Sequence, residues 1–272
     1  MPELPEVEIT TRGVEPFMRG QTIASLIVRV PKLRWPIDKD LDQKLKGATI
    51  KSVERRAKYI LINCTTSWLI VHLGMSGSLR VIRSKPSEPE KHDHFDMRLE
   101  NGTIIRYRDP RKFGAIIWTS SHPSEHPLLC RLGPEPFDTT FDGNLLYRTT
   151  RNKHSAIKSH IMNHHVVTGV GNIYANEALF CAGIRPTKKS STLSKNKLAV
   201  LSVCIRDILA RAIDAGGSSL KDFYRTDGST GYFQNEYMVY GRNDEPCRVC
   251  TRPIKVTIVG QRSTFYCPNC QK

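Results

Sequence analysis

Two pairs of cysteines near the C-terminus constrain the fold of this chain more than any other feature. Each pair has the form Cys-x-x-Cys, and sixteen residues separate the pairs, whose members are Cys247, Cys250, Cys267 and Cys270. This spacing is typical of a tetrahedral zinc site with four thiolate ligands. A metal with four protein ligands has no open coordination position, so the sequence predicts one structural zinc ion.

The residues between the two pairs predict a β-hairpin. Pro253–Val259 and Arg262–Tyr266 are rich in β-forming residues, and Gly260-Gln261 separates them. The alternative to zinc is two disulfide bonds in a secreted module, but the acidic N-terminus is not a secretory signal, so we expect an intracellular protein and favour zinc. The other four cysteines lie in apolar surroundings and are expected to be ordinary small buried residues: Cys64, Cys130, Cys181 and Cys204.

The chain carries a large positive charge. Its 272 residues include 41 Lys and Arg against 26 Asp and Glu, a formal net charge of +15. Such a charge attracts polyanions, so the composition favours nucleic acid as a partner over the simpler explanation, which is solubility with non-specific binding. No apolar run in the sequence approaches the roughly 18 residues of a membrane span. The length predicts two domains or three, and 39% hydrophobic residues suffice for a core.

The first half of the chain predicts one helix followed by many short strands. Apolar residues recur at helical spacing over residues 4–18, and Gly20 provides a stop. Residues 84–94 are polar, contain two prolines and are expected to form a loop. β-rich runs separated by turn signals predict a sandwich or barrel; they are 23–30, 49–53, 59–63, 68–72, 79–82, 95–99, 103–107 and 115–119.

The periodicity changes after a turn cluster at Leu132–Pro136. Helical patterns then appear at 156–162, 172–182 and 194–214, with a further short one at 219–223. The longest has a clean apolar stripe, formed by Leu198, Leu201, Ile205, Ile208, Leu209 and Ile213. Residues 224–232 are rich in Gly and Ser and are expected to form a loop.

The first residues contain a candidate nucleophile. Removal of Met1 would expose Pro2 as a secondary amine, which can attack a sugar aldehyde carbon and form a cationic iminium. Glu3, with its carboxyl protonated, can donate a proton to the sugar oxygen. The simpler explanation is that prolines and acids suit the first turn of a helix, and the spacing alone favours that explanation.

Short motifs are spread in order along the whole chain. They are Met1–Glu8, Arg55–Tyr59, His72–Ser78, Lys91–His94, Asp109–Gly114, Leu132–Pro136, Gly169–Tyr174, Gly231–Phe233, Tyr240–Arg242 and the cysteine pairs. Together they resemble the formamidopyrimidine-DNA glycosylase family. The resemblance implies excision of oxidised purines from duplex DNA through an N-terminal proline Schiff base, followed by strand cleavage by β,δ-elimination.

The resemblance also implies an α+β multidomain fold. We expect an N-terminal helix with a two-layer antiparallel β-sandwich as the catalytic domain (1–131), then a helix-two-turn-helix DNA-binding domain (132–223). The end of the lesion loop and a linker (224–240) and a zinc ribbon (241–272) follow. The implied partner is double-stranded DNA with oxidised purines or abasic sites. We expect a monomer in the bacterial cytosol and nucleoid, with no membrane attachment and no organic cofactor.

By this resemblance, Pro2 forms the Schiff base with C1′ of the damaged nucleotide and Glu3 is the general acid. Lys58 is implied in β-elimination and phosphate contact, and Arg262 in δ-elimination. A lysine is a compact point charge and an arginine is a planar phosphate fork, so both residue types suit these roles. Without the motif, Lys58 would be taken for an exposed strand lysine.

A glycosylase must extrude the damaged nucleotide and fill the gap that it leaves. The resemblance implies Met75, Arg111 and Phe113 as void fillers, with the arginine facing the orphaned cytosine. Core packing is the alternative for Met75 and Phe113, but neighbouring Gly and Pro residues indicate loop tips. The remaining implied DNA contacts are made by His92 and Lys153 and, to phosphates, by Lys158 and Asn172.

Asn172 follows Gly169-Val170-Gly171 and begins a predicted helix, where backbone N–H groups and the helix dipole favour an anion. A single Gly-x-Gly is weak support for this phosphate site by itself. Residues 148–160 hold four Lys or Arg, two His and no acid, as expected of a surface that follows a DNA backbone. Residues 219–232 match the family segment that closes over the flipped base.

Two other functions stay open. One is the related endonuclease VIII-like activity on oxidised pyrimidines, which shares the proline–glutamate start; Leu4–Val7 and the three void fillers favour the purine branch. The other is a non-enzymatic zinc-ribbon DNA binder, which explains the charge and the cysteines but not the N-terminal motif.

Overall fold

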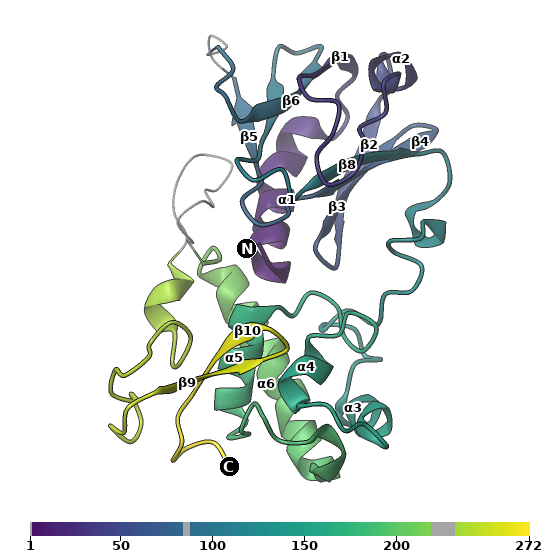
Figure 1. The fold of residues 1–272 in the computed structure, drawn as a ribbon. Coiled ribbons are helices and arrows are strands. Elements are labelled where there is room, and N and C mark those ends of the chain that lie inside the picture. The colour runs from purple at the N-terminus through teal and green to yellow at the C-terminus, as the bar shows by residue number, and fades with distance from the viewer. Residues whose placement is uncertain (1, 84–87, 219–231) are drawn as a thin grey trace. The chain divides into compact units, whose positions relative to one another are not determined.

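The computed structural model describes residues 2–83, 88–218 and 232–272, and Figure 1 labels its elements. The chain divides into two compact units, one within residues 1–130 and 215–232 and the other within residues 131–214 and 233–272. The helix expected at 219–223 lies outside the described residues. So do residues 84–87 of the expected polar loop and all but the last residue of the loop expected at 224–232.

The first unit begins with α1 (Leu4–Met18), the helix that the apolar spacing predicts. Its N-cap is Glu3, whose side chain accepts a hydrogen bond from the backbone N–H of Glu6, while the Glu6 side chain accepts the Glu3 N–H at 2.8 Å. This capping box satisfies two N–H groups that the helix itself leaves without a partner. The predicted apolar face is the one that packs, since its fully buried members are Leu4, Val7, Val14 and Met18.

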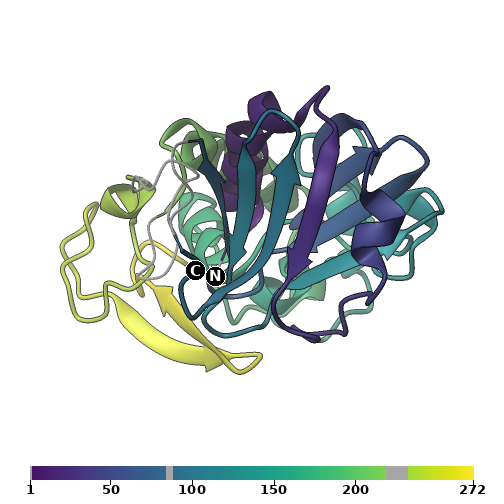
Figure 2. The same cartoon turned by 90° about the horizontal axis from the view of Figure 1, so that it is seen from above.

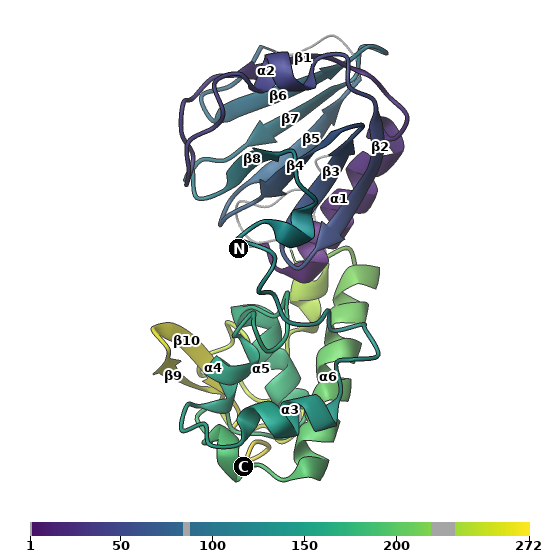
Figure 3. The ribbon, with the colours of Figure 1, turned by 90° about the vertical axis from the view of Figure 1, so that its right-hand side faces the viewer.

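Two four-stranded antiparallel sheets make up the rest of this unit. The strand order of one sheet is β1 (Ile23–Val28), β6 (Asp93–Leu99), β7 (Ile104–Arg108) and β5 (Ser78–Ile82). The other has the order β2 (Ile50–Arg56), β3 (Tyr59–Cys64), β4 (Ser67–His72) and β8 (Ala115–Thr119). Figure 3 shows the strands of both sheets, with α1 beside β2 and β3.

One hydrophobic core is shared by the two sheets. Buried side chains from α1 and from all eight strands meet in it, among them Val14, Leu26, Ile60, Phe95 and Ile116. The arrangement is therefore the two-layer sandwich that the run of short strands predicts. The sequence did not reveal α2 (Leu41–Leu45), because five residues are too few for a helical period to show.

The second unit is helical and ends in a hairpin. Its helices are α3 (Gly143–Thr150), α4 (Ile157–Ile161), α5 (Asn172–Cys181) and α6 (Lys195–Asp214). Short 3₁₀ turns lie at η2 (Ser190–Thr192) and η3 (Phe233–Glu236), as η1 (Pro123–Glu125) does in the first unit. The predicted hairpin consists of β9 (Lys255–Val259) and β10 (Arg262–Tyr266), shown in yellow in Figure 2.

Helix α6 has the predicted apolar stripe, whose buried members are Leu198, Leu201, Ile205, Ile208 and Leu209. Helix α3 packs against it and was not predicted. The packing is so close that a Cβ on Gly143 would lie 2.5 Å from Ala199 Cα. The local signal for α3 was its N-cap, Asp142, whose side chain accepts the Leu145 N–H at 2.7 Å.

The prediction for the four scattered cysteines is right only for Cys64. It is fully buried, and burial raises the pKa of its thiol to about 12. Cys130 is exposed, and Cys181 forms a disulfide with Cys204, which joins α5 to α6. The bonded cysteines are 23 positions apart in the sequence, so only the packing of two helices brings them together, and no local pattern shows it.

Within the described residues, no helix combines the length and the apolarity that a bilayer span requires.

Candidate active site and nucleic-acid interface

Pro2 and Glu3 lie at the N-terminal end of α1. Pro2 is buried, and the Glu3 side chain, 1% exposed, belongs to the capping box. The Glu6 carboxylate also accepts the N–H of Ser218 at 2.9 Å, which ties this end of the helix to a distant segment of the same unit. The candidate nucleophile and acid are therefore held on a braced helix end, the rigid support that such chemistry requires.

Lys58 lies in the tight turn between β2 and β3, not in a strand. Arg56 pairs with Tyr59 across this turn, and Ala57 has a left-handed φ of 55°. Burial, followed by the charges of Lys58 and Arg34, lowers the pKa of His72 to about 4. Two cations and a neutral imidazole thus lie close together, a setting that attracts phosphate.

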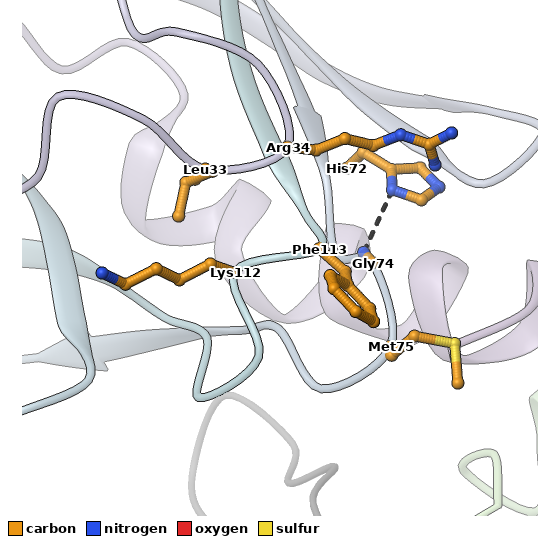
Figure 4. Close-up of a pocket in the computed structure, with 7 residues that line it drawn as sticks. All are labelled: Leu33, Arg34, His72, Gly74, Met75, Lys112 and Phe113. Atoms are coloured by element: carbon orange, nitrogen blue, oxygen red, sulfur yellow. Dashed lines mark hydrogen bonds between the residues drawn. The ribbon is translucent and has the colours of Figure 1, made fainter.

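A pocket of about 570 Å³ lies beside this cluster, lined by Leu33, Arg34, His72, Gly74, Met75, Lys112 and Phe113. Figure 4 shows Met75 and Phe113 on neighbouring loops that border it. The Phe113 side chain is 48% exposed, so packing in the core, the alternative for this residue, is wrong. The Arg111 guanidinium lies 4.8 Å from the centroid of the Phe113 ring, which brings the predicted void fillers together.

The buried carboxylate of Asp109 joins the two loops. It accepts hydrogen bonds from Ser76 Oγ at 2.8 Å, from the Arg111 N–H at 3.2 Å and from the Gly114 N–H at 2.9 Å. The backbones also touch, because a Cβ on Gly74 would lie only 2.4 Å from Gly114 N. The Gly74 N–H in turn donates to Nδ1 of the neutral His72 at 3.0 Å.

His92, another predicted DNA contact, is half-buried and is hydrogen-bonded to Asp109 of these loops. Its carbonyl accepts the Asp109 N–H at 3.0 Å, and the His94 ring is bonded to the Asp109 carbonyl at 2.9 Å. Four predicted DNA contacts of the first unit therefore lie on loops that are hydrogen-bonded to one another through Asp109. They are Met75, His92, Arg111 and Phe113.

The second unit carries the other predicted contacts. Lys153 is exposed and, with Arg148 and Arg151, lines a basic pocket of about 630 Å³. Arg262 is exposed at the start of β10, directly after Gly260 and Gln261, whose φ values are 56° and 60°. Positive φ at both central residues is typical of a tight two-residue hairpin turn.

Lys158 and Asn172 both bind the backbone of β10. Lys158 is fully buried, and its Nζ donates to the Ser263 carbonyl at 3.1 Å and to Thr264 Oγ1 at 2.7 Å. Asn172 Nδ2 donates to the same Ser263 carbonyl at 3.1 Å. The resemblance implied a phosphate contact for Lys158, whose ammonium lies inside the protein.

The four predicted zinc ligands meet at one point. Their Sγ atoms lie within 4.8 Å of one another, with 3.4 Å between those of Cys250 and Cys267 and 3.9 Å between those of Cys247 and Cys270. Ligands about 2.3 Å from a tetrahedral zinc ion lie about 3.8 Å apart, so the cluster fits this metal. Phe180, Val239 and Ile254 surround it with apolar contacts.

Two residues of the site escaped the sequence interpretation. Arg34 belongs to none of the motifs. Glu177 is buried on α5, and its carboxylate accepts the N–H groups of residues 238, 239 and 240 at 2.9, 3.0 and 2.8 Å. Burial raises its pKa. An acid on an otherwise apolar helix face was the available signal, because such a residue needs buried partners.

Comparison with known proteins agrees with this arrangement. Residues 1–116 match the formamidopyrimidine-DNA glycosylase N-terminal domain, 132–224 its H2TH domain, and 244–272 the zinc finger found in FPG and IleRS. The formamidopyrimidine-DNA glycosylase of Thioalkalivibrio sulfidiphilus is 52% identical, and the match covers 100% of both chains.

Two solved structures of the Lactococcus lactis protein share the fold. The wild-type protein bound to DNA that contains N7-benzyl-Fapy-dG is 36% identical with a TM-score of 0.90, over 100% of both chains. Its complex with abasic-site DNA is 35% identical with a TM-score of 0.90, over 99% of both chains. The expected α+β fold and the structural zinc site are confirmed. Because family models match most of its length and a relative is 52% identical, the chain belongs to the formamidopyrimidine-DNA glycosylase family.

Proposed function

We propose that this protein is a bifunctional DNA repair enzyme that excises 8-oxoguanine and formamidopyrimidines from duplex DNA and then cleaves the strand. The observation that carries the proposal is the buried Pro2–Glu3 pair on the capped end of α1, in the same unit as the framework of void fillers. A DNA-binding protein without enzymatic activity would need Glu3 only as the cap of α1.

The Pro2 amine, once Met1 is removed, attacks C1′ of the damaged nucleotide as the bond from C1′ to the base breaks. The departing base takes up the proton that the amine loses, and opening of the sugar ring leaves an iminium that joins protein and sugar. Glu3 supplies a proton to the sugar oxygen during this step. Lys58, beside His72 and Arg34, binds a phosphate of the damaged strand and assists β-elimination.

Met75, Arg111 and Phe113 fill the space that the extruded nucleotide leaves, and Arg111 faces the orphaned cytosine. The exposed Phe113 ring and the Arg111 guanidinium stacked on it support this role. His92, Lys153 and Asn172 bind the DNA around the lesion, and Arg262 acts in δ-elimination. We place the enzyme, as a monomer, in the bacterial cytosol and nucleoid, in line with its bacterial relatives.

Incision of matched duplexes tests the proposal. The protein should cleave a duplex with 8-oxoguanine opposite cytosine much faster than one with thymine glycol. A preference for thymine glycol would instead support the related activity on oxidised pyrimidines. Mass spectrometry first shows that the N-terminus of the protein is Pro2. If this protein then binds damaged DNA without any turnover, only the non-enzymatic DNA-binding function is left.

A further inference from the structure

The ammonium of Lys158 is held inside the second unit. The side chain is fully buried on α4, and its Nζ meets the Ser263 carbonyl at 3.1 Å and Thr264 Oγ1 at 2.7 Å. Withdrawing an ammonium from water is costly unless hydrogen bonds replace its hydration. Two of the bonds that replace it here are made to consecutive residues of one strand, β10.

Two asparagines of α5 bind the same stretch of β10. Asn172 Nδ2 donates to the Ser263 carbonyl at 3.1 Å, and the Phe265 N–H donates to Oδ1 of the fully buried Asn176 at 2.9 Å. Three side chains from two helices therefore hold residues 263–265. These interactions fix the position of the strand relative to α4 and α5.

The hydrogen bond from Lys158 to Thr264 leads on to the backbone of Arg262. Thr264 Oγ1 accepts from Lys158 and donates its own proton to the Arg262 carbonyl at 3.0 Å. On the other side, Arg262 adjoins the tight turn at Gly260, where an added Cβ would lie 3.3 Å from Ser159 Oγ of α4. The backbone of Arg262 is thus linked to Lys158 of α4 through Thr264, and the turn before it lies close to Ser159 of the same helix.

We propose that Lys158 is a positioning residue for strand cleavage: its buried ammonium sets the backbone of β10 and thereby places Arg262, and it does not itself bind a DNA phosphate. This inference rests on the role of Arg262 in δ-elimination under the proposed function. In that step, loss of a proton from C4′ breaks the C5′–O bond and leaves a 3′ phosphate on the upstream strand. A misplacement of about 1 Å can lower the rate of such a step about 100-fold.

The test uses an abasic-site duplex labelled at its 5′ end, on which β-elimination and β,δ-elimination leave products of different mobility. Lys158→Met keeps the length of the side chain and removes the charge. Thr264→Val breaks the link to Arg262 without touching any charge. Lys197→Met removes a lysine from an exposed position on α6 and serves as the matched control.

We expect both Lys158→Met and Thr264→Val to raise the ratio of β- to β,δ-product at least about fivefold, while Lys197→Met leaves it unchanged. Since the two residues act through one contact, the double variant should lie within about twofold of Lys158→Met alone. Trapping of the Schiff base, which precedes δ-elimination, should change less than the product ratio in every variant.

A wild-type product ratio in Thr264→Val, or effects that multiply in the double variant, would overturn the positioning role and return Lys158 to direct phosphate contact. Zinc content and thermal unfolding check that each variant folds; if Lys158→Met fails this check, Thr264→Val alone decides the question. A wild-type protein that does not cleave the abasic duplex would contradict the proposed function itself, which is a different result.

Discussion

At the scale of single residues, Glu3 has a structural and a proposed chemical role at one position. As the N-cap of α1 it accepts the Glu6 N–H, and as a general acid it must reach the sugar of the bound nucleotide. The two roles make different demands, because a cap needs only an acceptor oxygen whereas an acid needs a proton to give. A substitution that keeps an acceptor oxygen but removes the acidic proton therefore distinguishes the two roles.

Glu3→Gln should therefore lower the single-turnover rate of 8-oxoguanine excision at least about 100-fold, the usual contribution of a positioned acid. Its free energy of unfolding should stay within about 0.5 kcal/mol of wild type, because the glutamine oxygen still caps the helix. Glu15→Gln, on the same helix and paired with Arg19, is the control and should keep full activity. Equal excision by Glu3→Gln and Glu15→Gln would remove Glu3 from the chemistry.

His72 predicts how stability depends on pH. Its pKa is about 4 in the folded protein against an ordinary value of 6.5, so the unfolded chain binds the proton first as the pH falls. The free energy of unfolding should thus decrease between about pH 6.5 and pH 4, with roughly 1–2 kcal/mol from this residue by pH 5. His160, whose pKa is also lowered to about 4, acts in the same direction.

Denaturant unfolding of wild type and His72→Asn at pH 7.5 and pH 5.0 measures this contribution. The variant should lose less stability than wild type over that interval. An identical loss in both proteins would show that His72 is not the group responsible.

The two functional lysines show how far a sequence can place a single residue. Lys58 lies in the turn between β2 and β3, two strands adjacent in the sequence, so the local pattern places its backbone. The environment of Lys158 is formed by residues more than a hundred positions away, and Nζ binds Thr264. Neither charge nor spacing in the sequence distinguishes an exposed lysine from a buried one whose partners come from a distant hairpin.

At the scale of elements, the ribbon depends on its metal. Its two strands are short, and a lone two-stranded hairpin is marginally stable in water. Four thiolates around zinc supply the missing free energy, about 10 kcal/mol or more in small zinc-finger peptides. Under the proposed function, the position of Arg262 at the hairpin turn makes strand cleavage sensitive to this stabilisation.

The protein should contain about one zinc ion per chain, and Cys267→Ala should lose both the zinc and most of the β,δ-elimination product. Cys64→Ala, which removes a buried thiol that is not a ligand, is the matched control and should keep the zinc. Metal analysis of the purified variants measures the outcome. Full zinc occupancy in Cys267→Ala would contradict the assignment of the site.

The elements themselves were largely visible in the sequence, and the exceptions share a cause. The strands, the hairpin, α1 and α6 are long or regular enough for their periodicity to appear. Helices α2 and α3 are short, and α3 owes its place to the close packing of Gly143 on Ala199. The Cys181–Cys204 bond likewise depends on which helix faces which, and that is decided by tertiary packing.

At the scale of the whole molecule, the net charge of +15 indicates the partner but not the reaction. Some basic residues are paired with acids and add nothing to this net charge: Arg106 forms ion pairs with the buried Asp96 and Asp93, and Arg55 pairs with Glu8. The exposed remainder is available for attraction to the DNA backbone, which is independent of sequence and weakens with salt. The proposed chemistry is instead assigned to Pro2 and Glu3, which add no positive side-chain charge.

The central claim is that a covalent bond forms between Pro2 and C1′ of the damaged nucleotide, and borohydride trapping tests it most directly. With a duplex that carries 8-oxoguanine opposite cytosine, the account predicts a stable protein–DNA complex, with the DNA attached at Pro2 in the N-terminal peptide when the digest is analysed by mass spectrometry. Two results would contradict the account. One is the absence of a trapped complex from protein whose N-terminus is shown to be Pro2, and the other is attachment of the DNA at a lysine such as Lys58.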